Sequence, residues 1–391
     1  MRICIVSHLY PISRDDYKGI FVHEIATALR ARGHEVHIVT PRRPGGAAFE
    51  SHEGITVHRF RHWGWWRGRQ LGQLRGTPPL ILSTLMIAGL WTSLRVVLRY
   101  RPDLMSAYWV VPGGFLAWLT ARLTGRPVVV TAGGTDLNVS ARKWMYRPFV
   151  LRTVRGVDRL IACGSELHRV AISLGAAPER TVNMPSLVPD AVPELAVAPP
   201  EGAPGRRLLY VGNLAAPKRV DTLLRAMARL VPRFPDARLT LVGDGPLEPS
   251  LRALAQKLGV AECVDFRGRR PHEEIPGLMR SADVLLHCSE NEGLPVAIQE
   301  ALTCGLPVIA ARVGGVPDLV RDGTNGRLCA PDDDAAFAEA MAELVGDAAL
   351  RERMSAAARQ FAAEHLDRTS VIARIEAVYR EAIENRSRQR A

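Results

Sequence analysis

Several common functional motifs are missing from this sequence of 391 residues. Its six cysteines form no CxxC pair, and it contains neither a GxxxxGK[ST] loop nor a GxGxxG fingerprint. Phosphate-loop NTPases and dinucleotide-binding dehydrogenases therefore find little support. There is also no zinc-finger or RNA-recognition signature, so nucleic acid is not expected as a partner.

The cysteines are too scattered to suggest a disulfide framework. Most of them lie in apolar runs, which favours free buried thiols over disulfide bridges or metal ligands. Free thiols are typical of the reducing cytoplasm. The apolar run in the amino-terminal MRICIVSHLYP is shorter than a signal peptide requires, so we expect a cytoplasmic protein that begins with a buried strand.

Acidic residues are scarce in the first half of the chain. Residues 1–190 contain 25 Lys and Arg against 12 Asp and Glu, whereas the remainder contains 26 against 28. Between Gly54 and Pro102 there is no acidic residue, yet there are eight arginines and four tryptophans. Such a basic half is expected to face something anionic, for example a membrane surface or a phosphorylated substrate.

An uncharged stretch, TPPLILSTLMIAGLWTSL, occupies residues 77–94 of this basic segment. Its length barely reaches a membrane span, and Pro78, Pro79 and several Ser and Thr residues weaken that interpretation. The favoured interpretation is a core helix of an N-terminal domain. The next is contact with an anionic membrane surface through HWGWWRGR, residues 62–69, together with part of this helix.

Short apolar, β-branched runs alternate with segments of helical period along the whole chain. This alternation predicts an α/β protein with parallel sheets. Helices are expected at Val22–Ala31 and Asp221–Leu230. The runs expected to form strands are Ile3–Val6, Val36–Val39, Val128–Val130, Leu160–Ala162, Leu208–Val211, Leu239–Val242, Val284–Leu286 and Val308–Ala310.

The alternation stops and restarts at residues 185–204, PSLVPDAVPELAVAPPEGAP, which hold six prolines. Such a stretch is hard to fit inside a domain and predicts a stiff linker. Two domains are also expected from the length of the chain alone. We predict Rossmann-like halves at residues 1–184 and 205–365, followed by residues 366–391 with an amphipathic helix at Thr369–Ile383.

Two glutamates, Glu292 and Glu300, stand eight residues apart in SENEGLPVAIQEALTCGLP, residues 289–307. Pro295 suits a first helical position and Gly305 suits the residue past a helix end, which predicts a helix ending near Cys304. The amide groups and positive dipole at the start of such a helix favour an anion. Glu300 lies roughly 7–8 Å further along the axis, within reach of a group attached to that anion, such as a ribose diol.

Two strand-to-helix turns carry residues suited to the same kind of ligand. LLYVGNLAAPKRVDTLLRAM, residues 208–227, places Lys218 and Arg219 where two cations could clamp a diphosphate. LTLVGDGPL, residues 239–247, places glycine where the backbone can approach a ligand closely. Taken singly, each of these features is weak, because turn lysines and glutamates are usually solvated or capping charges.

Taken together, VGN…K, VGDGP, SxxEGLP…EA…CGLPVIA and GGVPDLV resemble the retaining nucleotide-sugar glycosyltransferases of family 4, over about residues 208–330. The first half is similar to this family more loosely, through SHLYP…KGIFVHEIATALRARGHEVHIVTP at 7–41 and VVVTAGGTDLN at 128–138. The arrangement resembles members of the teichuronic-acid or exopolysaccharide type.

The resemblance implies a GT-B fold, in which two Rossmann-like α/β domains face an interdomain cleft. The second domain would bind a nucleoside diphosphate sugar and the first a glycan or lipid-linked acceptor, with the C-terminal helix crossing back to the first domain. The implied activity is that of a hexosyltransferase-type glycosyltransferase in cell-surface polysaccharide biosynthesis. Such an enzyme would be cytoplasmic, or peripheral at the inner face of the membrane.

Residue roles follow from the same resemblance. Lys218 would neutralise the departing diphosphate, Glu300 would hold the ribose hydroxyls and Glu292 would lie by the donor sugar. The other donor-binding residues implied are Gly19, Gly212, Asn213, Arg219, Gly243, Gly293, Leu294, Pro295 and Val296.

The chain departs from the family pattern at two positions. Asn213 stands where many members carry arginine, and Arg219 is the residue expected to supply that charge. Gly133 stands where many members carry histidine in the mid-domain motif, which removes a usual contact with the transferred sugar and puts the catalytic role of Asp136 in question. Activity is still expected, because a front-face retaining mechanism works by positioning and charge stabilisation without a dedicated base.

No metal or other cofactor is expected. The acidic PDDDAA, residues 331–336, is more typical of a helix start than of a metal site. Two alternative functions stay open. One is a nucleotide-sugar epimerase, which would need histidine and acidic residues at the sugar. The other is a catalytically weak GT-B scaffold that binds a membrane or a partner through the tryptophan-rich basic segment. The motifs do not specify base, sugar or acceptor, although contacts to the base are expected near Arg267–Arg270.

Overall fold

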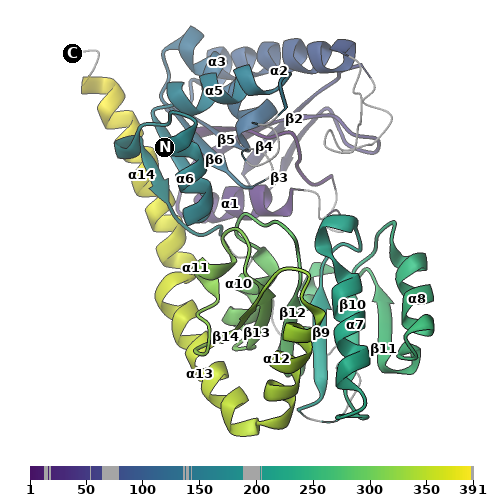
Figure 1. The fold of residues 1–391 in the computed structure, drawn as a ribbon. Helices are drawn as coiled ribbons and strands as arrows, with labels where there is room; N and C mark the ends of the chain where they lie inside the picture. Colours follow the sequence, from purple (N-terminus) through teal and green to yellow (C-terminus); the bar gives the residue numbers. More distant parts are fainter. Residues whose placement is uncertain are drawn as a thin grey trace. The chain divides into compact units, whose positions relative to one another are not determined.

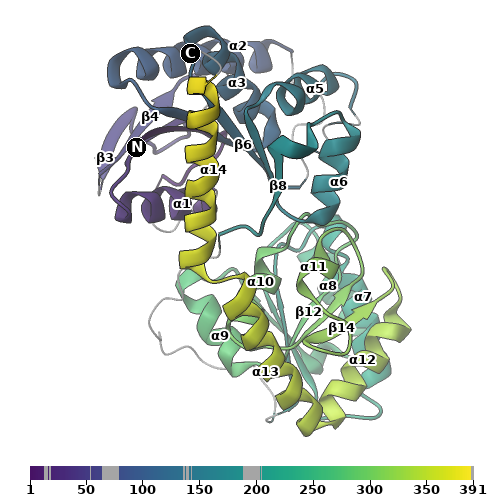
Figure 2. The same ribbon diagram turned by 90° about the vertical axis from the view of Figure 1, so that its left-hand side faces the viewer.

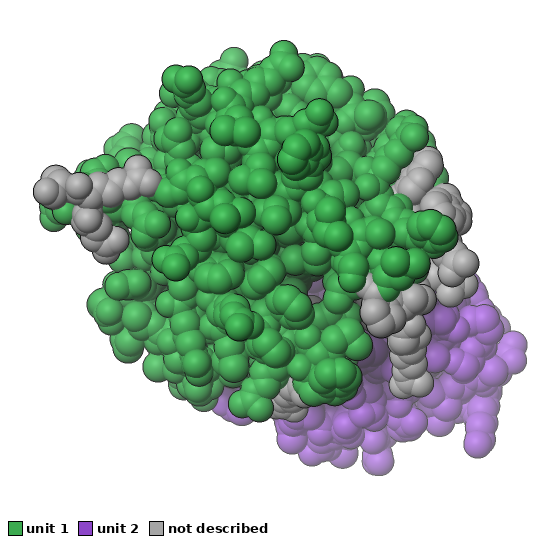
Figure 3. Space-filling view, turned by 90° about the horizontal axis from the view of Figure 1, so that it is seen from above, with its two compact units in different colours: residues 1–187, 369–391 green, residues 188–368 purple. Residues whose placement is uncertain are grey.

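The chain folds into two compact units, which are coloured separately in Figure 3. Unit 1 comprises Met1–Leu187 with Thr369–Ala391, and unit 2 comprises Val188–Arg368. The structure is a computed structural model. It describes residues 1–12, 16, 19–52, 54–63, 79–134, 137, 141, 143–187, 203 and 205–388.

Unit 1 is built on an eight-stranded sheet with the order β3-β4-β2-β1-β5-β6-β7-β8 (Figure 1). Neighbouring strands are parallel except for β3, which pairs with β4 in antiparallel fashion. The strands are β1 (Arg2–Val6), β2 (Glu35–Pro41), β3 (Phe49–His52), β4 (Ile55–Phe60), β5 (Leu104–Tyr108), β6 (Val128–Ala132), β7 (Arg159–Ala162) and β8 (Thr181–Asn183). The longer helices are α1 (Ile20–Ala31), α2 (Pro79–Tyr100), α3 (Phe115–Thr124), α5 (Arg147–Gly156), α6 (Ser165–Ser173) and α14 (Arg368–Arg388).

Unit 2 is built on a six-stranded, fully parallel sheet with the order β11-β10-β9-β12-β13-β14. Its strands are β9 (Arg207–Val211), β10 (Arg238–Val242), β11 (Val264–Gly268), β12 (Val284–His287), β13 (Val308–Ala311) and β14 (Gly326–Cys329). Its helices are α7 (Val220–Leu230), α8 (Glu248–Lys257), α9 (Ile275–Ser281), α10 (Val296–Thr303), α11 (Val316–Leu319), α12 (Asp334–Gly346) and α13 (Ala348–His365).

The apolar runs form the centres of both sheets because helices cover both faces, which leaves no solvated side for polar residues. Every strand predicted from the sequence is present, and the α/β fold class is confirmed. In α7 the buried positions Val220, Leu223, Leu224, Met227 and Leu230 recur at helical spacing and face the core of unit 2.

The C-terminal helix α14 belongs to unit 1, across which it runs in Figure 2. Its apolar residues Val371, Ile375 and Tyr379 enter the same core as the strands of unit 1. The Tyr379 hydroxyl is hydrogen-bonded to the Ser106 hydroxyl of β5 at 2.8 Å. Of the proline-rich segment, the structure describes only residues 185–187 and 203, so the linker prediction lies largely outside the described residues.

Helix α2 contains the uncharged stretch noted in the sequence. One of its faces is core, with Ile81, Leu85, Val96 and Val97 buried, as the favoured interpretation predicts. Among the described helices it is the one long and apolar enough to cross a membrane by length and composition, which by itself is weak evidence of a span.

All six cysteines are free thiols, and four of them are buried. The expected absence of disulfide bridges is therefore observed. Burial raises the pKa of the Cys4 thiol to about 12, so this residue behaves as a small apolar side chain of the unit 1 core.

Candidate functional site

The candidate residues of unit 2 gather where three adjacent parallel strands end. The loop after β9 carries Asn213 and Lys218, the loop after β10 carries Gly243, and the loop after β12 carries Glu292. A backbone hydrogen bond from the Glu290 amide to the Pro217 carbonyl, 2.9 Å, joins the first and third loops. The carboxyl edge of a parallel α/β sheet is the usual place for a ligand site.

The centre of this edge is a cluster of three side chains around one carboxylate oxygen. Lys218 Nζ lies 2.6 Å from Glu292 Oε1, and His287 Nε2 lies 2.9 Å from the same oxygen. Glu292 and His287 are nearly buried, while Lys218 keeps 30% of its side-chain surface exposed. Lys218 can therefore still contact a ligand, while its ion pair with Glu292 fixes its position.

The charge of Glu292 is stabilised by these partners. Burial alone would raise its pKa, but the hydrogen bonds and charges of His287 and Lys218 outweigh burial and hold the pKa of this carboxyl well below its usual range. Tyr210 lies nearby, and burial, with Cys288 and Glu292, raises its pKa well above the usual value. Its hydroxyl donates to the Asn213 carbonyl at 3.1 Å, which supports the loop after β9.

Helix α10 begins next to this cluster. It spans Val296–Thr303, so the predicted helix is one residue too long at each end: Pro295 is the residue before the helix and Cys304 the residue after it. Gly305 has a φ of 71°, as a residue past a helix end often does. Among the described residues no side chain caps the first turn of α10, which leaves its amide groups available to a ligand.

Gly293 and Leu294 form the approach to this helix. The Gly293 carbonyl accepts a hydrogen bond from the Gly315 amide at 2.9 Å, which fixes the loop against the turn after β13. Leu294 is buried, whereas Val296 stays partly exposed. The side chains of this segment thus alternate between partly exposed and buried, with Leu294 and Pro295 packed inward and Val296 at the start of the helix.

Glu300 lies on α10 four residues after Val296 and is 8% exposed. Its Oε1 atom is 2.7 Å from His272 Nε2, on the segment between β11 and α9. This contact with His272 uses only Oε1, so Glu300 Oε2 can contact another group. A buried acidic side chain within a helix needs such a partner, so Glu300 is not a solvated surface charge.

Gly212 and Gly243 allow the loop after β9 to contact the loop after β10. A Cβ atom on Gly243 would stand 1.9 Å from the Gly212 carbonyl oxygen, and the φ of Gly243 is 140°. No other residue type fits at Gly243 without moving the backbone. Asn213 follows directly, and its Oδ1 atom would be 2.5 Å from a Cβ on Gly245.

Arg219 occupies a different environment from Lys218. It has a φ of 49° and pairs with Asp332 at 2.6 Å and with Asp221 at 3.5 Å, while Glu290 lies 4.0 Å away. Three carboxylates thus already surround this guanidinium. Its expected role as a substitute for the arginine missing at Asn213 stays a prediction that would require exchanging one of these partners for phosphate.

In unit 1 the corresponding edge is made by the ends of β1, β5 and β6. Gly19 precedes α1 with a φ of 81°, and a Cβ atom there would stand 2.6 Å from the Leu9 carbonyl oxygen. Trp109, just after β5, has a φ of 64°, and its indole Nε1 would be 3.4 Å from a Cβ on Gly133. The indole therefore fills the space beside Gly133, the position at which the resemblance implies a histidine. Asp136 lies outside the described residues.

Aromatic rings surround Trp109. Its ring centroid is 4.2 Å from that of His8 and 4.9 Å from that of Phe21. Burial lowers the pKa of His8 to about 4, so this imidazole is neutral at pH 7. Its Nδ1 atom is buried and has no hydrogen-bond partner among the described residues.

Sequence reasoning missed His287, His272, Tyr210 and Trp109. His287 and Trp109 had a usable signal, because each is a polar or aromatic residue at the carboxyl end of a buried parallel strand. His272 had none, since its contact with Glu300 joins residues 28 apart in the chain.

The acidic PDDDAA segment starts a helix, as predicted. The Asp333 carboxylate accepts a hydrogen bond from the Ala336 amide at 2.9 Å and so caps α12. Within the described residues, no cluster of three or more His, Cys, Asp and Glu side chains is placed to hold a metal ion.

Comparison with known proteins agrees with this geometry. Residues 19–186 match the family model described as glycosyl transferase 4-like domain, and residues 198–361 match glycosyl transferases group 1. The chain is 31% identical to a D-inositol 3-phosphate glycosyltransferase of Thermobispora bispora, over 94% of this chain and 90% of the relative. It is 24% identical to an N-acetyl-alpha-D-glucosaminyl L-malate synthase of Bacillus anthracis, over 92% and 93% of the two chains.

Among solved structures, Anabaena HepE in complex with UDP superposes with a TM-score of 0.74 at 19% identity, covering 96% of this chain and 99% of that one. This likeness supports the fold, and the same HepE has been solved with UDP-glucose. With two family models that adjoin along the chain and a full-length relative above 30% identity, the protein belongs to the glycosyltransferases of GT-B fold that join a 4-like domain to a group 1 domain.

Proposed function

We propose that this glycosyltransferase moves a sugar from a nucleoside diphosphate sugar to a glycan or lipid-linked acceptor, with retention of configuration, in the synthesis of a cell-surface polysaccharide. The observation that carries the proposal is the pairing of Lys218 with Glu292 beside the uncapped start of α10. A half-exposed ammonium next to free helix amides suits a diphosphate. The HepE complexes with UDP and UDP-glucose support the same class of donor.

In the proposed donor complex, the diphosphate contacts the backbone amides of residues 293–297 and the Lys218 ammonium. Gly212 and Gly243 let the loops after β9 and β10 come close to it. Gly19, with its φ of 81°, is kept as a proposed donor-binding residue. Glu300 stands four residues into α10, about 6 Å along the axis, which is the distance from a phosphate to the ribose hydroxyls. His272 orients the Glu300 carboxylate toward them.

The state of Glu292 favours a front-face mechanism over a double displacement. A nucleophilic carboxylate needs a free oxygen lone pair of adequate basicity. Glu292 Oε1 is engaged by both Lys218 and His287, so the carboxylate is held as the partner of these two groups and is not presented as a nucleophile. We therefore assign Glu292 to holding Lys218 and a donor-sugar hydroxyl, while Lys218 stabilises charge on the leaving diphosphate.

The acceptor is proposed to bind unit 1 near the ends of β1, β5 and β6. The partly exposed Trp109 offers an aromatic face against which the apolar side of a sugar ring can lie. Asp136, which lies in the 128–138 motif with Gly133 and outside the described residues, is proposed to contact the transferred group. The basic balance of the first half fits an acceptor that carries phosphate, and action at the cytoplasmic face of a membrane.

Two successive experiments test first the class of donor and then the reaction. Thermal shift with UDP, GDP, ADP and dTDP identifies the base, because a ligand that binds only the native state raises the melting temperature. Nucleotide release is then measured with sugars of that nucleotide, with and without glycan acceptors. Release that rises with an acceptor, together with an α-linked product from an α-linked donor, is the expected result. Interconversion of the sugar, or silence across the panel, would contradict the proposal.

A further inference from the structure

Helix α2 is apolar on two opposite faces, although only one of them is packed. Leu80, Ile87, Trp91 and Leu98 are 56–74% exposed, and their spacing of seven, four and seven residues places them on one stripe. The helix is long and apolar enough to cross a membrane, yet only a third of its most apolar stretch is buried. An exposed stripe of large apolar side chains is characteristic of an interaction surface.

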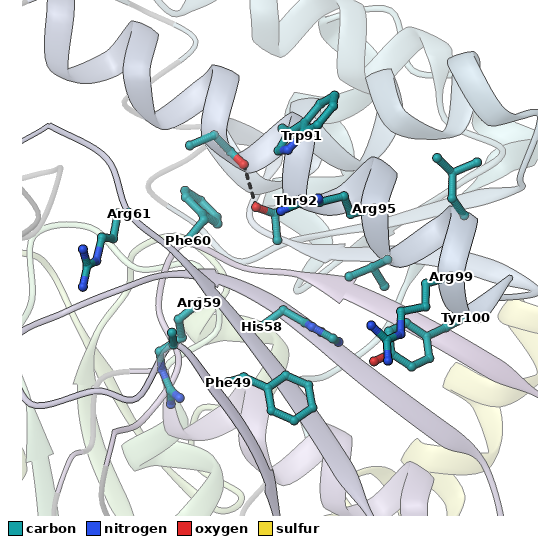
Figure 4. A pocket seen from close by; sticks show the side chains of 14 residues that line it. Phe49, His58, Arg59, Phe60, Arg61, Trp91, Thr92, Arg95, Arg99 and Tyr100 are labelled. Carbon is teal, nitrogen blue, oxygen red and sulfur yellow. Dashed lines mark hydrogen bonds between the residues drawn. The ribbon is translucent and has the colours of Figure 1, made fainter.

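A pocket of about 1010 Å³ opens beside this stripe, between α2 and the strands β3 and β4 (Figure 4). Phe49 and His58 form one wall, and Trp91, Arg95 and Arg99 of α2 form the other (Figure 4). None of the residues that line it is acidic. The pocket therefore combines cationic and aromatic side chains at the border of an apolar stripe.

Two exposed arginines that line the pocket, Arg95 and Arg99, lie on α2. Arg59 is paired with Glu50 at 2.8 Å and is not available to a ligand. Arg95 and Arg99 stand one turn apart, are exposed, and among the described residues have no carboxylate partner. Each is instead placed over an aromatic ring, Arg95 at 5.6 Å from the Trp91 centroid and Arg99 at 5.4 Å from that of Tyr100.

We propose that this face of unit 1 docks on an anionic phospholipid bilayer, with the α2 stripe in the interfacial layer and a lipid head-group phosphate held by Arg95 and Arg99. Arginine binds phosphate through two parallel hydrogen bonds, and apolar residues next to a cationic cluster are the pattern of interfacial helices. The face is not suited to pairing with a second copy of the chain, because two such surfaces would bring four unpaired arginines together.

The inference concerns a surface of unit 1 and does not rest on the proposed sugar transfer, whose charged centre lies in unit 2. The test is flotation of the purified full chain with vesicles of phosphatidylcholine alone or with one quarter phosphatidylglycerol, at low and high salt. Binding is expected only with phosphatidylglycerol, and it should weaken as salt screens the arginines.

Two variants separate the contribution of the apolar stripe from that of the arginines. Ile87→Ser with Trp91→Ser and Leu98→Ser removes the stripe, and Arg95→Glu with Arg99→Glu reverses the charge. Each should reduce vesicle binding at least about tenfold. The matched control is Lys257→Glu with Arg353→Glu, which makes the same change in net charge on exposed residues of unit 2.

Circular dichroism and the melting temperature confirm that every variant remains folded. Equal binding to both kinds of vesicle, or full binding by the two α2 variants, would overturn the proposal. Self-association that the stripe variant abolishes would overturn it in favour of a second copy. A chain that binds vesicles but no nucleotide would leave this inference standing and remove the proposed donor site.

Discussion

The Lys218 ammonium and the Glu292 carboxylate form an ion pair of 2.6 Å, and His287 lies 2.9 Å from the same carboxylate oxygen. Two loops that follow different strands are thereby held together at the carboxyl edge of the unit 2 sheet. The lysine is fixed before any donor arrives, so little reorganisation is needed when a diphosphate binds. Preorganisation of this kind is where most electrostatic stabilisation of a transition state comes from.

Lys218→Ala should lower kcat by about 10²–10³-fold, by analogy with the loss of one preorganised donor in other active sites. The substitution removes the charge that faces the leaving diphosphate and also leaves the nearly buried Glu292 with His287 alone. Steady-state rates of nucleotide release measure the effect. Lys257→Ala, at an exposed position at the end of α8, is the control and should match the wild type. Undiminished turnover by Lys218→Ala would remove this lysine from the site.

The low pKa of Glu292 gives a second prediction, on pH. Its value in the folded protein lies below the usual 4.5, so the ionised pair stabilises the fold above pH 4.5. That contribution is lost as the pH falls through the folded value. Glu292→Gln should therefore lower the melting temperature by a constant amount between pH 5.5 and 8, and by less below pH 4.5. A difference that instead changes between pH 5.5 and 8 would mean that a group of this cluster, and not the ionised Glu292 alone, sets the stability near neutrality.

Regular elements were more predictable than contacts in this chain. The eight apolar runs became strands because a parallel sheet covered on both faces selects continuous β-branched sequence. In strands such as β4, ITVHRF, and β11, VDFRG, apolar residues alternate with polar or charged ones. These strands therefore lack the continuous apolar run on which the strand predictions were based. These two lie at or near the sheet margins, where polar side chains can reach water.

The site was predictable where one motif contained it. Gly293, Leu294 and Pro295 adjoin α10, and their common location follows from their adjacency in the sequence. The partners His272 and His287, and the three carboxylates around Arg219, arise from contacts between separate loops. Such contacts depend on how β9, β12 and β14 are ordered in the sheet, which spacing along the chain does not specify.

Glu300→Gln should weaken UDP binding about tenfold while leaving inorganic pyrophosphate binding unchanged. The amide keeps the shape of the side chain but loses the charge that strengthens hydrogen bonds to ribose hydroxyls, a difference of about 1–2 kcal/mol. Isothermal titration with the two ligands distinguishes a ribose contact from a phosphate contact. The exposed Glu262→Gln is the control. An equal loss for both ligands would place Glu300 at the diphosphate or show a general disturbance of α10.

Removal of divalent metal ions should leave the rate unchanged. In the proposed reaction the charge on the leaving diphosphate is balanced by Lys218 and the amides of α10, so no cation is required between them. The measurement is nucleotide release after dialysis against EDTA, with and without added Mg²⁺ or Mn²⁺. A rate that falls on dialysis and returns with either ion would show that a metal neutralises the diphosphate in place of, or together with, Lys218.

Trp109→Ala should reduce kcat/KM for the acceptor about two- to tenfold, as expected for the loss of one aromatic contact of about 0.5–1.5 kcal/mol, and leave hydrolysis of the donor unchanged. Trp109→Phe should retain most of the activity, and Trp144→Ala, 84% exposed in the same unit, should have no effect.

Gly133→His tests whether the indole has taken over the space of the family histidine. A Cβ atom at this position stands 3.4 Å from Trp109 Nε1, so we expect an imidazole directed toward Trp109 to displace the indole. The single variant should therefore lose activity with acceptor, and adding Trp109→Ala should restore part of it because the imidazole then has room. If Gly133→His is fully active beside an intact Trp109, the two side chains do not compete and the indole is not a substitute for the histidine.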